Sequence, residues 1–401
     1  MIKKPILLAP VGNYEMLTSA IKGGADAVYL GVRGLNMRET AKNFTLKDLP
    51  KITKIAHQSK VKVYLTVNVV CFDEEIKDVK KTLLAAKKAK IDAIIAWDLG
   101  VIKLAKELKL EIHLSTQSSV SNSLAIEEYK KFGVKRVVLA RECSLEQIKK
   151  IIKNTKLEIE IFIHGAMCVA LSGRCFLSQF TYGNNTSANR GKCIQPCRRE
   201  YLATDIETGK QLEIHNNFIL SPKDLCTLSF IEKILEIKPH ALKIEGRGKS
   251  PEYVYIVTRA YREAIDAYYS KKLTSKLKDK LITEIKTVYN REFSSGFYLG
   301  KPINEWTKTR GSSATKTKTK LGKITNYFSN IGVAEIKIES QSLKINDDIL
   351  IIGPTTGVLE ENVKTMEYSI NNPTKIAKKG ELVAIKVKER VRRNDEVYLF
   401  K

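Results

Sequence analysis

Eight short apolar runs rich in β-branched residues alternate with charged, amphipathic segments between residues 6 and 246. Segments such as 73–90 and 144–154 carry apolar residues at helical spacing, with Lys and Glu on the opposite side. Eight such units favour an α/β fold, a (β/α)8 barrel of the TIM type, over an open doubly wound sheet, which usually has a glycine-rich first turn. The first turn here, Pro10-Val-Gly-Asn13, has no GxGxxG pattern. The predicted strands are Ile6–Pro10, Ala27–Gly31, Val63–Asn68, Ala93–Asp98, Glu111–Thr116, Arg136–Ala140, Glu158–Gly165 and Ala241–Gly246.

A barrel of this kind carries its chemistry at the C-terminal ends of the strands, and in this chain those ends are more polar than the strand bodies. The eighth run places Lys243 and Glu245 on one face and Leu242 and Ile244 on the other, because side chains alternate along a strand. The two charged side chains either form a structural salt bridge at the barrel mouth or serve the site. The polar strand ends are Asn68, Asp98, 115–117, Arg141, Glu142, His164, Glu245 and Arg247.

A long segment after the seventh run carries most of the cysteines. About 75 residues separate Gly165 from Ala241, more than a strand–helix unit needs, so the barrel contains an insertion at about 166–240 that we expect to be functional. Thiols this dense are typical of soft-metal sites and iron–sulfur clusters. Disulfides are the competing interpretation, but the N-terminal apolar run stops at Pro10, too short for a signal peptide, and no stretch could span a membrane. We therefore expect a cytoplasmic chain with reduced thiols and no membrane contact. The cysteines of the insertion are Cys168, Cys175, Cys193, Cys197 and Cys226.

The spacing of these cysteines favours an iron–sulfur cluster over zinc. Structural zinc sites usually pair cysteines with about two to four residues between them, whereas six residues lie between Cys168 and Cys175. A radical S-adenosylmethionine enzyme needs Cys-x3-Cys-x2-Cys, and no such run occurs. Cys71 and Cys143 have surroundings that predict structural roles, whereas Cys226 is an open candidate for a ligand.

The chain is strongly basic, with 69 Lys and Arg against 44 Asp and Glu and a formal net charge of +25. Such an excess attracts polyanions, above all nucleic acid, unless the lysines are merely solvated on helix faces. Residues 307–320 are basic and poor in apolar side chains, which predicts a linker or, alternatively, a phosphate-contacting segment. Residues 321–401 show short alternating strands between turn residues and predict a small C-terminal β-barrel domain after a barrel domain of residues 1–306.

The segment after the eighth run, Gly246-Arg-Gly-Lys-Ser250, resembles the end of a phosphate-binding loop. Such a loop needs its first glycine at position 243, which is lysine, so we reject that interpretation. Ser250 followed by Pro251 predicts the start of the last barrel helix instead.

Seven stretches of the chain carry specific motifs: Leu8–Asn13, Gly24–Gly31, Glu160–Cys168, Ser172–Ser178, Cys193–Arg198, Ser221–Cys226 and Leu242–Arg247. Together they resemble the peptidase U32 family. The resemblance implies a family once labelled collagenase-like proteases, several of whose members are oxygen-independent hydroxylation proteins with an iron–sulfur cluster. Those members act on tRNA wobble uridine, ribosomal RNA cytidine or a quinone precursor, and the plan of barrel, basic linker and one small β domain most resembles the tRNA hydroxylation proteins.

The same resemblance implies a cofactor, a co-substrate and a partner. Cys168, Cys175 and Cys193 would be three ligands of a [4Fe–4S] cluster, and the fourth would be either Cys197 or Cys226. Prephenate is the implied co-substrate. The implied partner is RNA, with tRNA ahead of rRNA.

Within this scheme, Arg141, Lys243 and Arg247 would hold the carboxylates of prephenate, and His164 or Glu245 would move protons. A U32-type peptidase is the rival function. No HExxH or GxSxG occurs, and of five histidines only His164 lies at a strand end in polar company. A non-catalytic RNA-binding or assembly protein is the third hypothesis.

Overall fold

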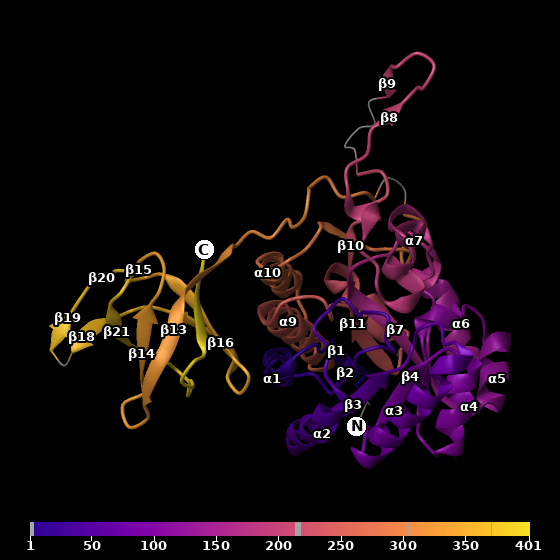
Figure 1. Ribbon diagram of the computed structural model, residues 1–401, viewed down its shortest axis with the longest axis horizontal. Helices are drawn as coiled ribbons and strands as arrows, with labels where there is room; N and C mark the ends of the chain where they lie inside the picture. The colour runs from indigo at the N-terminus through magenta and orange to yellow at the C-terminus, as the bar shows by residue number, and fades with distance from the viewer. Residues whose placement is uncertain (1–3, 213–217, 303–304, 370) are drawn as a thin grey trace.

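Eight parallel strands close into a barrel in the computed structural model, which describes residues 4–212, 218–302, 305–369 and 371–401. Each barrel strand pairs in parallel with the next, and β11 pairs with both β1 and β7, which closes the ring. Every one of these strands overlaps a predicted run, so the (β/α)8 prediction is confirmed (Figure 1). The barrel strands are β1 (Ile6–Pro10), β2 (Ala27–Gly31), β3 (Lys62–Thr66), β4 (Ala93–Ala96), β5 (Ile112–Leu114), β6 (Val134–Val138), β7 (Glu158–Gly165) and β11 (Ala241–Ile244).

Helices follow the strands and surround the ring (Figure 1). Local sequence sets where they begin: the side chains of Asn13 and Asp98 accept hydrogen bonds from first-turn N–H groups, and Ser144 forms a capping box with Gln147. Within the described ranges, no helix has the length and apolarity needed to cross a membrane. The helices are α1 (Tyr14–Lys22), α2 (Leu49–Gln58), α3 (Ile76–Lys88), α4 (Leu99–Glu107), α5 (Ser123–Lys131), α6 (Leu145–Asn154), α8 (Ile231–Glu236), α9 (Pro251–Tyr269) and α10 (Ser275–Lys286).

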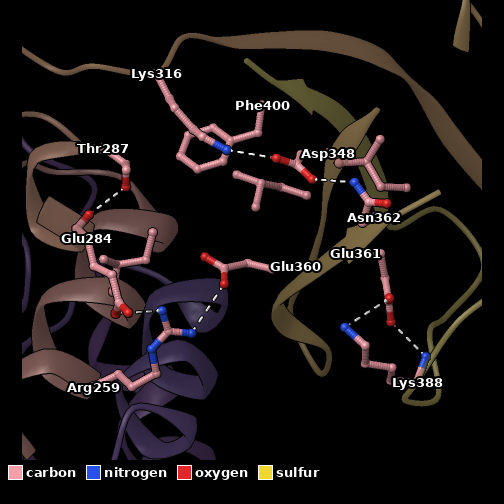
Figure 2. A pocket seen from close by; sticks show the side chains of 13 residues that line it. Arg259, Glu284, Thr287, Lys316, Asp348, Glu360, Glu361, Asn362, Lys388 and Phe400 are labelled. Carbon is pink, nitrogen blue, oxygen red and sulfur yellow. Dashed lines mark hydrogen bonds and ion pairs between the residues drawn. The ribbon is translucent and has the colours of Figure 1, made fainter. Parts of the chain in front are cut away.

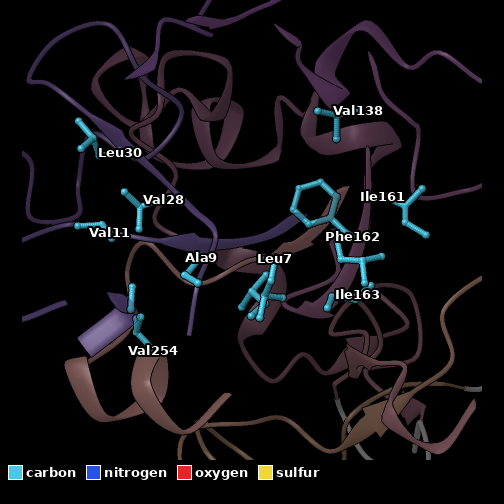
Figure 3. Packing of buried hydrophobic residues seen from close by; sticks show 14 of the residues in the cluster. Leu7, Ala9, Val11, Val28, Leu30, Val138, Ile161, Phe162, Ile163 and Val254 are labelled. Atoms are coloured by element: carbon cyan, nitrogen blue, oxygen red, sulfur yellow. The ribbon is translucent and has the colours of Figure 1, made fainter. Parts of the chain in front are cut away.

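The main hydrophobic core lies between the strands and these helices. Leu7, Val28 and Ile161 of the strands are buried in it, together with Val254 of α9 (Figure 3). Burial of aliphatic side chains of this size contributes about 1.5–3 kcal/mol each. This core holds the barrel rigid, and in barrels of this type the loops at the C-terminal mouth carry the functional residues.

The insertion after β7 adds elements that the sequence analysis missed. β10 (Asp224–Cys226) runs antiparallel to the end of β7, and β12 (Phe293–Ser294) pairs with β10. The insertion also contains the short helix α7 (Leu177–Tyr182) and a projecting hairpin (Figure 1). The hairpin strands are β8 (Ala203–Thr204) and β9 (Gln211–Leu212). Residues 213–217 of the predicted insertion lie outside the described residues.

The C-terminal region is all-β, as predicted. Its antiparallel sheet has the order β17-β16-β22-β13-β14-β21-β18-β19. β13 begins at Lys318, inside the segment predicted as a linker over 307–320, because residues 318–320 pair with β22. The strands are β13 (Lys318–Phe328), β14 (Val333–Ile338), β16 (Asp348–Gly353), β17 (Gly357–Asn362), β18 (Glu367–Ser369), β19 (Asn372–Pro373), β21 (Leu382–Lys386) and β22 (Glu396–Phe400), with β15 (Leu343–Lys344) and β20 (Ile376–Ala377) as a separate pair.

Polar contacts join the C-terminal domain to the helices of the barrel. The Thr18 hydroxyl of α1 donates to the carbonyl of Pro354 at 2.6 Å. Arg259 of α9 bridges the two domains, with its guanidinium 3.3 Å from Glu284 of α10 and 3.2 Å from Glu360 of β17 (Figure 2). These contacts place the β domain beside the first and last helices of the barrel.

The basic segment that leads into the β domain is itself tied down by ion pairs. A lysine that is already paired with a carboxylate attracts a phosphate less strongly. The ion pairs therefore weaken the interpretation of residues 307–320 as a phosphate-contacting segment. The pairs are Lys316 with Asp348 at 2.8 Å, Lys318 with Glu252 at 2.8 Å and Lys320 with Glu396 at 3.1 Å.

Candidate metal centre and barrel mouth

Four cysteines of the insertion converge on one cavity at the C-terminal end of the barrel. Cys168, Cys175, Cys193 and Cys197 line this space of about 110 Å³, which we call the thiol cavity. All four are free thiols. Burial raises the pKa of Cys175 and of Cys197, and the neighbouring sulfurs of Cys168 and Cys193 raise both further. Thiols whose pKa is raised in this way ionise readily when a metal cation binds them.

Two of these sulfurs already accept hydrogen bonds from the backbone. The N–H of Leu177 donates to Sγ of Cys175 at 3.3 Å, and the N–H of Gln195 donates to Sγ of Cys193 at 3.3 Å. In each case the donor lies two residues after the cysteine. Hydrogen bonds to sulfur stabilise the thiolate and tune the potential of iron–sulfur centres.

The loops that carry the cysteines are anchored to the rest of the barrel mouth. Arg190 forms an ion pair with Glu75, with Nη1 2.8 Å from Oε2. The N–H of Glu39 donates to the carbonyl of Gly191 at 2.9 Å. Gly191 has a φ of +75°, and a Cβ at this position would collide with the carbonyl of Asn36. Glycine is therefore required where the insertion touches the loop after β2.

The donor set of the thiol cavity fits a [4Fe–4S] cluster, which four thiolates hold. Within the described ranges, no three His, Cys, Asp or Glu side chains are arranged to hold one metal ion. Thiolates attach to separate corners of a four-iron cube, so they stand further apart than the ligands of one zinc ion. Four thiols around one cavity, with backbone donors to two of the sulfurs, match the requirements of a [4Fe–4S] cluster.

Cys226 and His164, two of the predicted site residues, lie elsewhere. They are partners across β10 and β7, and neither lines the thiol cavity. His164 packs against the rings of Tyr253 and Tyr261 of α9. Burial lowers the pKa of His164 to about 4 and raises that of Cys226 to about 11. Both groups are therefore uncharged at neutral pH, and Cys197 is the fourth thiol of the cavity.

A second cavity occupies the mouth of the barrel beside the thiols. Lys243, Glu245 and Arg247 all line it, together with Arg38 and Arg141. We call it the barrel-mouth cavity, and it faces four cations and one carboxylate. The residues that line both cavities are Met37, Arg38, Thr116, Gln117 and Arg141.

Arg247 is held in this cavity by neutral groups alone. The residue is 3% exposed, and its guanidinium donates to the Thr66 hydroxyl at 3.0 Å and to the side-chain oxygens of Asn36 and Asn43 at 2.6 and 2.5 Å. Its Nε has no hydrogen-bond partner within the described part of the chain. Burial lowers the pKa of Arg247 to about 10, so the group stays charged at neutral pH. A buried cation without a carboxylate favours the entry of an anion.

Arg141 is a second cation of this type. Its Nη1 donates to the carbonyl of Ala166 at 2.7 Å, and its guanidinium carbon lies 3.9 Å from the centroid of the Phe162 ring. Its Nε is also buried without a hydrogen-bond partner among the residues described. Because Arg141 lines both cavities, its free hydrogen-bonding capacity is available between the thiols and the barrel mouth.

Lys243 is paired, but with Glu160 rather than with Glu245. Nζ of Lys243 lies 3.0 Å from Glu160 Oε1, and Arg136 approaches the other oxygen of the same carboxylate at 3.4 Å. Burial lowers the pKa of Lys243, while the charge of Glu160 opposes the shift. The charge of Lys243 is therefore partly neutralised by Glu160 inside the barrel.

Glu245 is bound by Arg38, a residue that the sequence analysis missed. Nε and Nη2 of Arg38 donate to one carboxylate oxygen of Glu245 at 3.1 and 2.9 Å. Burial acts to raise the pKa of Glu245, but the charges of Arg38, Arg141 and Lys249 outweigh it, and the pKa is lowered. Arg38 lies in an irregular loop after β2, and its position after the C-terminal end of a strand was its only signal in the sequence.

Comparison with known proteins identifies the group to which this arrangement belongs. The sequence pattern of peptidase family U32 matches residues 12–308. A collagenase of Porphyromonas gingivalis is 46% identical over 98% of this chain and 97% of its own, and an uncharacterized protease of Methanocaldococcus jannaschii is 43% identical over 98% of both chains. The tRNA hydroxylation protein P1 of Bacillus subtilis is 34% identical over 91% of this chain and 87% of its own. The matches cover the barrel and the insertion with its thiols, and the chain belongs to the peptidase U32 family.

Proposed function

We propose that this protein hydroxylates an RNA base without molecular oxygen, with an iron–sulfur cluster as its cofactor. The specific reaction that we propose converts the wobble uridine of tRNA to 5-hydroxyuridine with prephenate as co-substrate. The relatives carry the names of enzymes, and one of them is named for tRNA hydroxylation. The main support for this proposal is one observation: a cavity lined by four thiols adjoins a barrel mouth that is rich in cations.

The cations of the barrel mouth suit a dicarboxylate. Arg247 and Arg141 each hold an unpartnered Nε in the described structure, and neither is neutralised by a carboxylate of the chain. Guanidinium groups bind carboxylates through paired, charge-assisted hydrogen bonds. Prephenate carries two carboxylates, so the two arginines would orient it across the mouth. Lys243 would add positive charge from β11, although its ion pair with Glu160 reduces that contribution.

Glu245 is the group best placed to take up a proton in this cavity. Its lowered pKa keeps it ionised at neutral pH, and the two hydrogen bonds from Arg38 fix its orientation. An ionised carboxylate at hydrogen-bonding range of a substrate acts as a general base. His164, the other predicted proton carrier, does not line the barrel-mouth cavity.

The thiols of Cys168, Cys175, Cys193 and Cys197 would hold the cluster at the rim of the barrel mouth. A [4Fe–4S] cluster bound there supplies redox or Lewis-acid chemistry beside the substrate. Arg141, which lines both cavities, would bind and orient the substrate next to it, and Arg38, which also lines both, would hold the Glu245 carboxylate in place.

A U32-type peptidase is the second candidate, because two relatives carry protease names. Serine and cysteine nucleophiles are commonly activated by a histidine, and no histidine is among the described residues that line the two cavities. The Ser172 hydroxyl of the thiol cavity donates to Glu142 at 3.2 Å, but the same carboxylate also accepts from the Ser172 N–H at 3.0 Å, the pattern of a loop contact. The Ser115 hydroxyl instead donates to Gln117 and accepts from Asn68. The geometry therefore supports hydroxylation better than peptide hydrolysis.

Mass spectrometry of nucleosides from separated tRNA and rRNA tests the proposal. A deletion strain should lack 5-hydroxyuridine in tRNA, and the wild-type chain should restore it, whereas the Cys168→Ala variant should not. The anaerobically purified protein should leave gelatin intact. Unchanged RNA nucleosides together with gelatin cleavage would establish the peptidase, and a change confined to 5-hydroxycytidine in rRNA would contradict tRNA as the substrate.

A further inference from the structure

A third and larger space lies between the barrel and the C-terminal domain, and we call it the interdomain cleft. Its volume is about 850 Å³. The loop after β11 and the start of α9 form one wall, and β22 and the residues around Pro354 and Arg393 form the other. Arg247 lines both this cleft and the barrel-mouth cavity. The cleft therefore adjoins the site at which we place the substrate.

Positive side chains outnumber negative ones along the cleft, and most of the negative ones are already engaged. Asp395 is buried and accepts hydrogen bonds from the Thr356 hydroxyl and from the N–H of Arg392. Glu396 accepts from Lys320 at 3.1 Å. The cations of the lining are Lys42, Arg247, Lys249, Lys318 and Arg393, and the carboxylates are Glu15, Asp395 and Glu396.

Four of these cations make no ion pair within the described part of the chain: Lys42, Arg247, Lys249 and Arg393, whereas Lys318 is paired with Glu252. Lys249 is partly buried, with Nζ 3.1 Å from the centroid of the Tyr289 ring. Burial lowers the pKa of Lys249 to about 8. An ammonium group that is desolvated without a carboxylate partner is stabilised when an anion binds beside it.

The N-terminus of α9 opens into the same cleft. Ser250 and Pro251 line it, and the helix that they begin is 19 residues long. The Ser250 side chain makes no capping hydrogen bond, which leaves N–H groups of the first turn available to a ligand. Helix N-termini attract anions, and barrels of this type often bind phosphate after their last strands. The segment Gly246–Ser250, rejected as a P-loop by its spacing, therefore still leads into a place suited to phosphate.

Arg247 gives a further indication of an anionic ligand, at the end of the cleft that meets the barrel mouth. It is 3% exposed, and its Nε is buried without a hydrogen-bond partner among the described residues. It stands where the cleft and the barrel mouth meet, because it lines both. An anion at this junction would lie within reach of the buried guanidinium and of the start of α9.

We propose that the interdomain cleft binds a backbone phosphate of the RNA while the target base enters the barrel mouth. This inference rests on the proposed function for the identity of the nucleic acid. Lys42, Lys249 and Arg393 would contact the phosphate oxygens, together with the first-turn N–H groups of α9. The base and the phosphate of one nucleotide would then lie on the two sides of Arg247, and the C-terminal domain would serve as the outer wall of the RNA site.

Salt-dependent binding of a tRNA anticodon stem-loop to the full-length, anaerobically purified protein tests this placement. Each phosphate contact steepens the dependence of log K on log salt by about 0.9 on duplex and about 0.7 on single-stranded nucleic acid. The variant Lys42→Ala/Lys249→Ala/Arg393→Ala should therefore lose about 0.7 to 0.9 of the slope, the share of one phosphate, and bind at least tenfold more weakly. The matched control Lys77→Ala/Lys80→Ala/Lys87→Ala removes three exposed charges from α3 and should keep the wild-type slope. Because Lys249 is partly buried, Lys42→Ala/Arg393→Ala serves as a second variant, and equal melting temperatures confirm that both variants are folded.

Neutral methylphosphonate linkages introduced one at a time identify the phosphate. One linkage next to the target uridine should weaken binding to the wild-type protein about tenfold and have no effect on the triple variant, because the contact is already lost there. Equal penalties in both proteins, or a wild-type salt slope in the triple variant, would overturn the inference.

Calorimetry with inorganic phosphate tests whether the cleft binds free phosphate instead of an RNA phosphate. If phosphate binds tightly and the RNA does not displace it, the cleft is a site for free phosphate and the inference fails. The binding assay does not depend on turnover, so a loss of hydroxylation alone would count against the proposed function and leave the cleft assignment standing.

Discussion

Cys226 and His164 are paired across β10 and β7, and one hydroxyl, that of Tyr261, lies 3.7 Å from Sγ of the first and 3.4 Å from Nδ1 of the second. The same hydroxyl donates to the carbonyl of Ile163 at 2.8 Å and accepts from the N–H of Thr227 at 3.0 Å. A cysteine and a histidine that the sequence offered as site residues are thus held in a buried contact between the barrel and α9. The contact joins β10 to β7 and α9.

Iron content should distinguish Cys197 from Cys226. The Cys197→Ala variant should lose most of its iron, because Cys197 lines the thiol cavity, whereas Cys226→Ala should retain wild-type iron. The wild-type chain should carry about four irons and four sulfides. Cys226→Ala should instead lower the free energy of unfolding by about 1 kcal/mol, as core substitutions commonly do. Iron and sulfide analysis of anaerobic preparations measures the first effect, and stoichiometric zinc in their place would contradict the cluster.

Stability should fall in mild acid because of His164. Its folded-state pKa of about 4 lies below the unfolded value of 6.5, so only the unfolded chain binds a proton between these values. The contribution is complete above pH 6.5 and is lost as the pH falls toward 4, by about 3 kcal/mol in all. Urea unfolding at several pH values should show this loss, and His164→Gln should flatten the dependence. The neighbouring Tyr253→Phe exchange should keep the wild-type slope, and a pH-independent stability in the wild type would contradict the burial of a neutral imidazole.

Arg247 and Arg141 should set the affinity for the carboxylated co-substrate. Arg247→Lys keeps the charge but loses the planar fork, so it should raise the KM for prephenate about tenfold to a hundredfold, the range expected for one charge-assisted hydrogen bond. Arg141→Met should have an effect of similar size. Iron content should stay at the wild-type level in both variants. Arg259→Lys at the domain interface is the matched control and should leave KM unchanged, and an unaltered KM in Arg247→Lys would remove that residue from the binding site.

Arg38 should control the acid side of the pH–rate profile through Glu245. In the wild type the lowered pKa of Glu245 keeps the carboxylate ionised, so hydroxylation should stay constant as the pH falls from 8 to about 5. Arg38→Ala removes the largest favourable charge, which raises the pKa of Glu245 and moves the loss of activity to higher pH. Glu245→Gln should be inactive at every pH. If Arg38→Ala lowers the rate equally at all pH values, Arg38 binds substrate and does not act through Glu245.

The strands and the barrel could be predicted because their signal is local: runs such as Ile6–Pro10 and Glu158–Gly165 are bounded by the residues that end them. The alternation along the eighth strand likewise placed Lys243 and Glu245 on one side, and both line the barrel-mouth cavity. The position of His164 could not be predicted in this way. A shift of register between Lys243 and Ile244 leaves Ile163 without a partner on β11, so the alternation is broken after Phe162 and His164 packs toward α9.

The choice between Cys197 and Cys226 was also beyond sequence analysis, because both lie in matching motifs and only the antiparallel β10 removes Cys226 from the cavity. Arg38 was missed because it sits in an irregular loop, where no periodic pattern points to a side chain's direction. The cations of the interdomain cleft come from segments as distant in the chain as Lys42 and Arg393, and only the packing of the two domains brings them to one cleft.

The contact at Gly191 makes the thiols and the substrate site sensitive to the same disturbance. The insertion is bonded there to Glu39, in the loop after β2 that also carries Arg38 and Asn43. Arg38 binds Glu245 and Asn43 binds Arg247, so a displacement of the insertion would also displace both of these contacts. Loss of the cluster that we propose for the thiol cavity would therefore also loosen the contacts of Arg38 with Glu245 and of Asn43 with Arg247. A chain that cannot hold the proposed cluster should then bind carboxylates more weakly as well, so cofactor and substrate would be lost together.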